Sequence, residues 1–362
     1  MTGESSSAIL GSSGKDLIAL GEVMLRLDPG ETRIRSVRRF EVWEGGGEYN
    51  VARSLSTTFG FTTAIVTALV DNEIGRLIEG LIRSSGVDTS SITWRDFDGI
   101  GSTARNGINF LERGYGIRGA LGVSDRGHTA SSKMDFTDTN WATLFSNNAC
   151  GWFHTGGIFA GLSEMSENTA IAALELARHY SVTTSVDLNF RPSLWKHQAH
   201  RVPQRVFTRL VSNADLVIGG ETDFVERLHI PVSTAPTFIG RFSELACKLL
   251  DKFPTVRVVA CSERISHSAS RNYWRGHAYS QADGLVSSRE FDDLEILDRV
   301  GGGDGLAAGL IFGLRTGRTL RESINIGAAS GALVMTTPGD GSMASLSEVL
   351  DVASGERAKT NR

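Results

Sequence analysis

The feature that most constrains the fold of this chain is an alternation of short apolar runs and longer amphipathic segments from Asp16 onward. The apolar runs are rich in β-branched residues and predict strands, whereas the segments between them follow the period of a helix. Strands joined through helical crossovers run parallel to one another. We therefore expect an α/β fold: a mostly parallel central sheet with helices on both faces.

The pattern predicts individual elements as well. The expected strands are Leu17–Leu20, Thr63–Thr67, Gly151–Thr155, Thr183–Asp187, Leu216–Ile218 and Val256–Ala260. The clearest expected helices are Asn50–Phe59, Glu167–His179 and Asp304–Leu314.

Two regions, about 24–43 and 101–126, break this rhythm with residue alternation and turn-forming glycines, which predict antiparallel hairpins. We expect the two hairpins to form a small β-sheet lid. They are inserted near the ends of core strands, where ligands bind in open α/β sheets, so the lid could close over a substrate. The rest of residues 15–362 is expected to form one α/β domain, and the Ser- and Gly-rich residues 1–14 a disordered tail.

Charge and cysteine usage exclude several classes of partner. The formal net charge is -4 without a block of Lys and Arg, so neither nucleic acid nor an anionic membrane is an expected partner. No run approaches the roughly 20 apolar residues that cross a bilayer, and the N-terminus lacks the basic and apolar regions of a secretory signal. The three cysteines are widely spaced, which predicts neither disulfides nor a zinc site and favours a cytoplasmic location.

The run Asp298–Asp304 places three consecutive glycines before an Ala- and Leu-rich helical segment. Free backbone N–H groups and the positive end of the helix dipole at such a junction can hold a phosphate. Asp304 in the first turn could accept a proton from an attacking hydroxyl. The run fits a tight turn equally well, with Asp304 as a helix cap. By itself it leaves both interpretations open.

Two other glycine motifs do not fit the chain. A P-loop needs Gly-Lys followed by Ser or Thr, but the only Gly-Lys pair, Gly14-Lys15, is followed by Asp16. A dinucleotide fingerprint needs Gly or Ala where Leu306 stands, and it follows a first strand instead of lying near the C-terminus. A Rossmann oxidoreductase is therefore disfavoured.

The pattern Asp298-x-x-Gly301-x-Gly303-Asp304 resembles the C-terminal signature of the ribokinase-like (PfkB) carbohydrate kinases. Residues 45–52, Gly-Gly-Gly-Glu-Tyr-Asn-Val-Ala, resemble their N-terminal Gly-Gly-x-x-x-Asn-x-Ala signature. The two signatures occur in the family's order about 250 residues apart, and the resemblance extends from Leu17 to about Leu350. It implies a ribokinase-like fold and magnesium-dependent phosphoryl transfer from ATP to a sugar.

The resemblance also implies roles for individual residues. It implies Asp304 as general base, an anion hole of Gly301, Gly302 and Gly303, a sugar site of Gly46, Asn50, Asn109, Arg126, Ile158 and Arg191, nucleotide contacts from Ser262, Arg264, Asn325 and Ala329, and indirect Mg²⁺ binding by Asp223. Simpler interpretations stay open: a turn at Gly45–Gly47, a helix cap at Asn50, a solvated charge at Arg264 and a polar helix position at Asn325.

A third segment, Asp187–Trp195, resembles the Asp-x-Asn-x-Arg-x-x-Leu-Trp segment of 2-keto-3-deoxygluconate kinases. Arg191 in this segment suits bidentate binding of a sugar-acid carboxylate, or it forms a salt bridge with Asp187. Two positions depart from the pattern. Asn109 stands where a Tyr is usual, and Gly220-Glu221-Thr222-Asp223 replaces the family's Asn-x-x-Glu, which leaves Glu221 as another candidate for the metal.

We therefore expect a cytoplasmic kinase that phosphorylates a primary hydroxyl of 2-keto-3-deoxygluconate or a related sugar acid. Its expected partners are the sugar acid, ATP and further copies of the chain, in a homodimer paired through the lid or in a higher homo-oligomer. Two alternatives remain: a kinase of the same family for a neutral ketose or a nucleoside, and a catalytically impaired sugar-binding protein.

Overall fold

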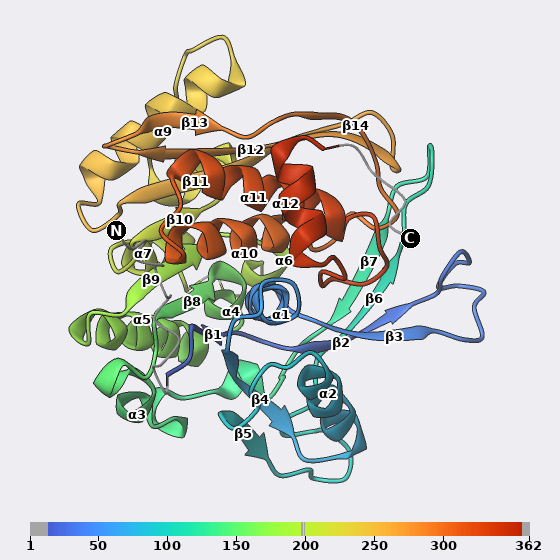
Figure 1. Ribbon diagram of the computed structural model, residues 1–362. Coiled ribbons are helices and arrows are strands. Elements are labelled where there is room, and N and C mark those ends of the chain that lie inside the picture. The colour runs from blue at the N-terminus through green and yellow to red at the C-terminus, as the bar shows by residue number, and fades with distance from the viewer. Residues whose placement is uncertain (1–13, 197, 199, 357–362) are drawn as a thin grey trace, which may run out of the picture.

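The computed structural model describes residues 14–196, 198 and 200–356. The predicted N-terminal tail, apart from Gly14, lies outside the described residues. The chain forms a ten-stranded central sheet and a separate four-stranded sheet that projects from one side of it (Figure 1).

The central sheet is mostly parallel, as predicted. Its strands, in spatial order, are β13 (Gly284–Ser287), β12 (Arg271–Ser280), β11 (Val258–Ser266), β10 (Leu216–Ile218), β9 (Thr183–Asp187), β8 (Trp152–Gly156), β1 (Leu17–Leu20), β4 (Thr63–Val70) and β5 (Ile92–Arg95), and β14 (Phe291–Glu295) also pairs with β12. The strands from β11 to β5 pair in parallel, whereas β12 pairs antiparallel with β11, β13 and β14.

Helices cover both faces of this sheet because its strands are apolar on both sides. In β1, Ile18 and Leu20 belong to one buried apolar cluster, whereas Leu17 and Ala19 belong to another. The first cluster includes residues of α3 (Trp141–Phe145), α4 (Gly157–Gly161), α5 (Glu164–His179), α6 (Pro192–Trp195), α7 (Pro203–Val211), α8 (Glu221–Leu228) and α9 (Phe238–Lys252). The second includes residues of α1 (Gly47–Thr57), α2 (Glu73–Ser84), α10 (Gly302–Arg315), α11 (Leu320–Val334) and α12 (Leu346–Ser354).

Strands 17–20, 183–187 and 216–218 have the predicted bounds, but other boundaries differ. The strand predicted at Val256–Ala260 is β11, which extends to Ser266 because its polar second half pairs with β12. Such a segment carries no apolar run that would reveal it. Helix α1 begins at Gly47 and α10 at Gly302, so both helices start within the glycine runs.

The small four-stranded sheet, here called the lid sheet, consists of β3 (Glu41–Gly45), β2 (Met24–Asp28), β6 (Ile108–Glu112) and β7 (Leu121–Asp125), in that order. The two predicted hairpins, β2–β3 and β6–β7, are both antiparallel. They join through parallel pairing of β2 with β6, which makes one sheet from segments far apart in the sequence.

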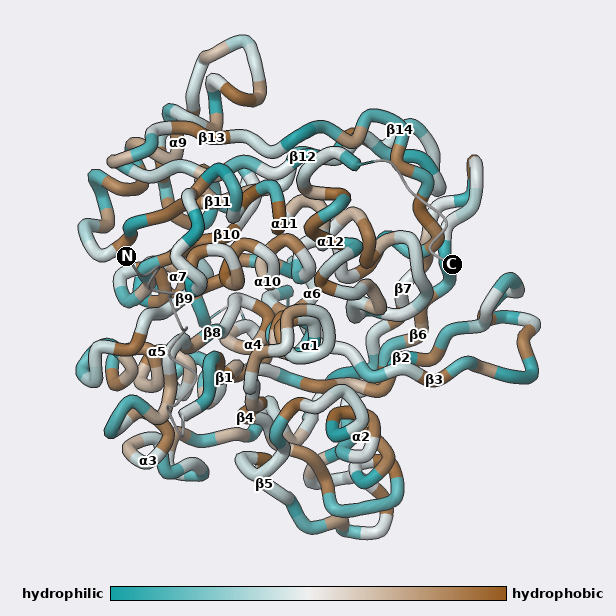
Figure 2. Tube along the Cα trace, viewed as in Figure 1, coloured by the Kyte–Doolittle hydropathy of each residue, from teal (hydrophilic) through white to brown (hydrophobic). Residues whose placement is uncertain are grey.

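The hydropathy of the residues reflects the arrangement of the two sheets. Apolar residues concentrate at the centre of the molecule, along β10 and α10, and they alternate with polar residues along the lid strands (Figure 2). No helix in the described part of the chain is both long and apolar enough to span a membrane.

Candidate active site

The glycine loop leads directly into α10. Gly301 has a φ of 80°, and a Cβ atom at this residue would lie 2.2 Å from the backbone oxygen of Asp340, so only glycine fits. Gly302 and Gly303 form the first turn of the helix, where backbone N–H groups have no helical acceptor. A Cβ at Gly303 would meet no atom within 4 Å, so the loop is open on this side. The loop therefore has the geometry of an anion-binding helix N-terminus.

Asp304 is a buried carboxyl group in the same first turn. Its Oδ2 accepts a hydrogen bond of 2.7 Å from Asn50 Nδ2. Burial raises the pKa of Asp304 to about 7, against the opposing effects of the Asn50 hydrogen bond and the charge of Arg191. A carboxyl group with this pKa can exchange a proton near neutral pH.

The N-terminal glycine turn lies beside Asp304. A Cβ at Gly46 would lie 1.9 Å from the Glu22 backbone oxygen, so the close approach of the two backbones requires glycine there. Asn50 Oδ1 accepts from the Gly46 N–H at 3.3 Å while its Nδ2 donates to Asp304. Asn50 therefore holds the two glycine motifs together, a role beyond the predicted cap or sugar contact.

Gly47 lies at the meeting point of these elements. A Cβ at Gly47 would lie 3.5 Å from Asn189 Nδ2, 3.8 Å from Asp304 Oδ1 and 3.9 Å from Ile158 Cδ1. Gly47 is thus close both to the predicted residue Ile158 and to the predicted base. The same measurement identifies Asn189, which the sequence analysis did not assign although it lies within the recognised Asp187–Trp195 segment.

Two other predicted sugar residues already have protein partners. Arg126 donates to the buried carboxylate of Glu22, with Nε 2.9 Å from Oε2 and a second contact through Nη2. Asn109 Oδ1 accepts from the Ser124 hydroxyl at 3.0 Å. Arg126 is therefore not a free cation, and sequence reasoning missed Glu22 because it precedes Arg126 by 104 residues.

Arg191 is exposed at the N-terminus of α6 and forms no ion pair with any residue of the described ranges, so the alternative salt bridge with Asp187 does not form. Asp187 belongs instead to a group of carboxyls. Burial raises its pKa well above the ordinary value, and Asp304 and Asp223 raise it further, whereas Arg191 opposes the shift. Its position at the end of a core strand, where ligands bind in open α/β sheets, could have identified Asp187 as a site residue from the sequence.

Of the two carboxyls considered for magnesium, Asp223 is the better placed. Glu221 forms an ion pair with Arg241 at 2.8 Å. Asp223 Oδ2 accepts from the Gly220 N–H at 3.1 Å and has no cationic partner within hydrogen-bonding distance in the described structure; burial raises its pKa. Among the described residues, no three His, Cys, Asp or Glu side chains cluster closely enough to enclose a metal. A carboxylate without a cationic partner, such as Asp223, suits indirect binding of Mg²⁺, because that ion keeps several of its water ligands.

The predicted nucleotide residues separate into two pairs. Ser262 and Arg264 lie on β11, and Arg264 is exposed. Asn325 and Ala329 lie on α11, where Asn325 Oδ1 accepts from the Arg289 N–H at 2.8 Å and Ala329 is completely buried. The Ala329 side chain cannot contact a nucleotide in this structure.

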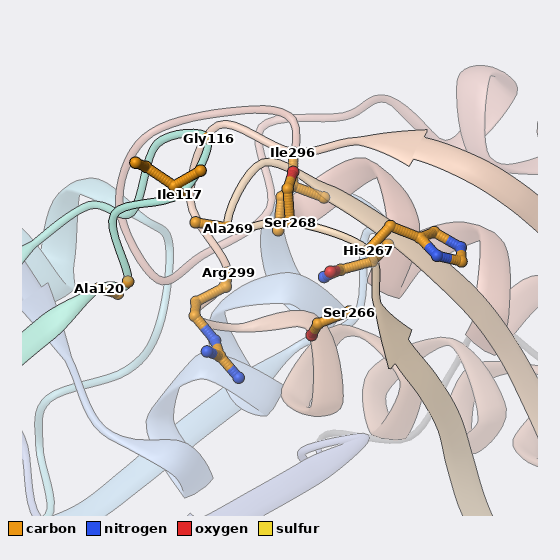
Figure 3. Close-up of a pocket in the computed structure, with 11 residues that line it drawn as sticks. Gly116, Ile117, Ala120, Ser266, His267, Ser268, Ala269, Ile296 and Arg299 are labelled. Carbon is orange, nitrogen blue, oxygen red and sulfur yellow. The ribbon is translucent and has the colours of Figure 1, made fainter.

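Arg299, which the sequence motifs did not single out, faces a cavity of about 370 Å³ between the lid sheet and the core. Figure 3 shows its guanidinium between Ala120 and Ser266 of β11. Ala120 belongs to the loop that joins β6 to β7, residues 113–120, here called the lid loop. Beside the cavity, the lid loop contacts the core through a 2.8 Å hydrogen bond from Ala269 N to the oxygen of Gly116. Burial, then the charges of Arg299 and Arg191, lower the pKa of Arg264. These three arginines are neighbours, an arrangement that an anion would stabilise.

An anion-binding helix N-terminus, a titratable carboxyl beside it and a β-sheet lid are the parts of a small-molecule kinase site in an α/β fold. The match to the model of the pfkB family carbohydrate kinases covers residues 15–259 and 274–346. The chain belongs to this family of phosphotransferases, as the two glycine signatures predicted.

Individual relatives agree with this assignment. A 2-dehydro-3-deoxygalactonokinase of Haloferax volcanii is 28% identical over 351 residues, 96% of this chain and 99% of the relative. The crystal structure of a 2-dehydro-3-deoxygluconokinase from Thermotoga maritima is 32% identical, with a TM-score of 0.85 over 94% of this chain and 99% of that one. A fructokinase from Xylella fastidiosa with bound ATP shares the fold at 18% identity and a TM-score of 0.72 over 94% of this chain and 98% of that one.

Proposed function

We propose that this protein transfers the γ-phosphoryl group of ATP to a primary hydroxyl of 2-keto-3-deoxygluconate or a closely related sugar acid. The observation that carries the proposal is the bond between Asn50 and Asp304, which joins the two glycine motifs around one titratable carboxyl. The relatives from Haloferax and Thermotoga, both named as kinases of keto-deoxy sugar acids, support the choice of substrate class.

In the proposed reaction, Asp304 removes the proton from the sugar hydroxyl. A bond forms between that oxygen and the γ-phosphorus, while the bond from the γ-phosphorus to the β,γ-bridging oxygen breaks and ADP leaves. The N–H groups at Gly301–Gly303 and the dipole of α10 stabilise the charge that develops on the phosphoryl oxygens. Asp223 and Asp187 would hold Mg²⁺, which would supply positive charge that neutralises the phosphates. Arg264 and the neighbouring Arg299 would bind the nucleotide phosphates.

Arg191 is the proposed anchor of the acid group, because it is the predicted sugar-site cation without an acidic partner in the described structure. Arg191→Gln should lower kcat/KM for the sugar acid by about 10–100-fold through loss of a charge-assisted bond, mainly in KM. A coupled assay of ADP release with the sugar acid, fructose and a nucleoside would measure this effect.

Arg205→Gln is the matched control, because Arg205 lies on α7 away from the lid and the glycine loop. Equal losses in both variants would argue against a specific contact of Arg191. Wild-type preference for fructose or a nucleoside would reject the sugar-acid assignment. Sugar binding without release of ADP would instead identify a catalytically impaired binding protein.

An apolar row across the lid sheet supports the proposed homodimer. Strand register places Val42, Leu27, Phe110 and Val123 side by side across all four strands. Val42 and Val123 are 40% and 48% exposed, and every residue of edge strand β7 is exposed. An apolar row next to an open strand edge is complementary to a second copy related by twofold symmetry.

Val123→Glu should convert the dimer to a monomer, because a charge would be buried within the apolar row. Light scattering after size exclusion would measure the mass. The control is Val232→Glu, at a loop residue that is 64% exposed outside the lid sheet. A monomeric wild-type protein, or a dimeric Val123→Glu variant, would count against pairing through this face.

A further inference from the structure

Arg26 is a buried guanidinium in lid strand β2, with 1% of its surface exposed. It donates to carboxylates from three parts of the chain: Asp28 in its own strand, Asp298 at the start of the glycine run and Asp340 after α11. Burial opposes the charge of Arg26, but Asp340 and Asp298 outweigh this effect and raise its pKa above the ordinary value. The lid sheet is therefore tied to the core through a permanently charged side chain.

Asp298 transmits this contact to the glycine loop. Its Oδ1 accepts from the Val300 N–H at 3.2 Å, immediately before Gly301. Its own N–H and that of Leu297 donate to the Met335 oxygen at 3.2 and 2.8 Å. The segment that leads into the glycine loop is thus held by two contacts. Arg26 binds the Asp298 carboxylate, and the Met335 oxygen, just after α11, accepts hydrogen bonds from the backbone of the segment.

Asp340 connects Arg26 to both glycine motifs. Its backbone oxygen would lie 2.2 Å from a Cβ at Gly301, and its Oδ2 would lie 2.3 Å from a Cβ at Gly45. The residue is therefore packed between the loop proposed for phosphate and the turn proposed for sugar.

The positive and negative charges around Arg26 cancel only in part. Arg113 contributes the second cation, with its Nε 2.9 Å from Asp28 Oδ2 and 3.9 Å from Asp298 Oδ2. Two guanidinium groups thus face three carboxylates in a buried region. Such networks add little stability over a well-packed apolar core, so their value here is geometric: a planar guanidinium holds two acids in one arrangement.

We propose that Arg26 is a positioning residue, which fixes the glycine loop in the geometry for phosphoryl transfer through Asp298 and Asp340. The inference rests on the proposed kinase function. Arg26 touches neither reactant in this role. Its loss should therefore lower the rate of transfer and leave the binding of substrates nearly unchanged.

The experiment compares Arg26→Lys, Arg26→Met and the pair Arg26→Met with Asp298→Asn in the full-length protein. Lysine keeps the charge but lacks the planar fork that bridges two acids. We expect kcat to fall by about 10–100-fold in all three, while KM for sugar acid and for ATP changes by less than about threefold. Arg33→Met is the control, because Arg33 pairs with Glu112 in the same sheet without touching the glycine loop.

The paired substitution distinguishes a loss of glycine-loop positioning from a loss of folding stability. Arg26→Met alone leaves buried carboxylates unbalanced, and Asp298→Asn removes one of those charges while keeping an acceptor for Val300. The melting temperature should recover in the pair, whereas kcat should stay low. Recovery of both, or wild-type kcat in Arg26→Lys, would overturn the proposal.

Amide hydrogen exchange of residues 296–306 provides a readout that does not depend on activity. Exchange in this segment should be faster in Arg26→Lys than in the wild type and unchanged in Arg33→Met. If the wild-type protein phosphorylates no sugar acid, the proposed function fails, and unchanged exchange in Arg26→Lys would still reject the positioning role. Faster exchange in Arg26→Lys would support the positioning role even in that case.

Discussion

Replacing Asp304 by Asn is expected to lower kcat by about 10²–10⁴-fold, the usual contribution of a general base. The amide has almost the same shape and can still accept the Asn50 hydrogen bond of 2.7 Å, but it cannot take a proton. KM should change little, because the substitution removes an interaction that develops only during transfer. Initial rates of ADP release with saturating sugar acid and ATP would measure the loss.

The pH dependence provides an independent check on Asp304. Because its pKa is raised to about 7, the base is half protonated near neutral pH, and kcat/KM of the wild type should fall tenfold per unit below that value. The residual activity of Asp304→Asn should lack this step. A wild-type profile that is flat between pH 5 and about 8 would contradict the assignment of Asp304 as the base.

Unfolding experiments separate lost chemistry from lost structure. The pKa of Asp304 is higher in the folded state than its ordinary value of 3.8, so ionisation opposes folding as pH rises through about 7. Asp304→Asn carries no charge and should melt at a higher temperature than the wild type at pH 8, with a smaller difference at pH 5. A variant that is both inactive and less stable at pH 8 would point to structural damage.

Gly301→Ala is expected to lower kcat by about 10²–10³-fold, because displacing the backbone N–H donors should cost about as much as removing one from an anion hole. The added methyl group would collide with the Asp340 backbone oxygen, so the loop must shift. The left-handed conformation at Gly301 adds strain, and together these effects should lower stability by about 1–3 kcal/mol. Chemical denaturation and the ADP assay would measure the two effects separately.

The control is Gly80→Ala in α2, where a Cβ meets no atom within 4 Å. Alanine is preferred to glycine within a helix, so this variant should be slightly more stable and fully active. If Gly301→Ala instead loses stability but keeps its rate, the loop does not hold the transferred phosphoryl group.

The amino-acid sequence by itself determined the architecture and the reaction class. Apolar periodicity and turn residues act over a few positions, so β1, β9 and β10 could be located to the residue and both lid hairpins recognised. The glycine signatures depend on local conformation in the same way. These signatures did not predict the residue at which each helix begins, because α1 and α10 begin inside glycine runs that favour turns.

Only the tertiary structure decided which polar side chains face one another. Arg26 and Asp298 are 272 residues apart, and Arg26 and Asp340 are 314 apart, so no local pattern connects them. The same holds for Arg126, which Glu22 neutralises, and for Arg191, which remains without an acidic partner in the described structure. The pKa of a buried carboxyl such as Asp304 likewise depends on the desolvation and charges that the folded chain places around it.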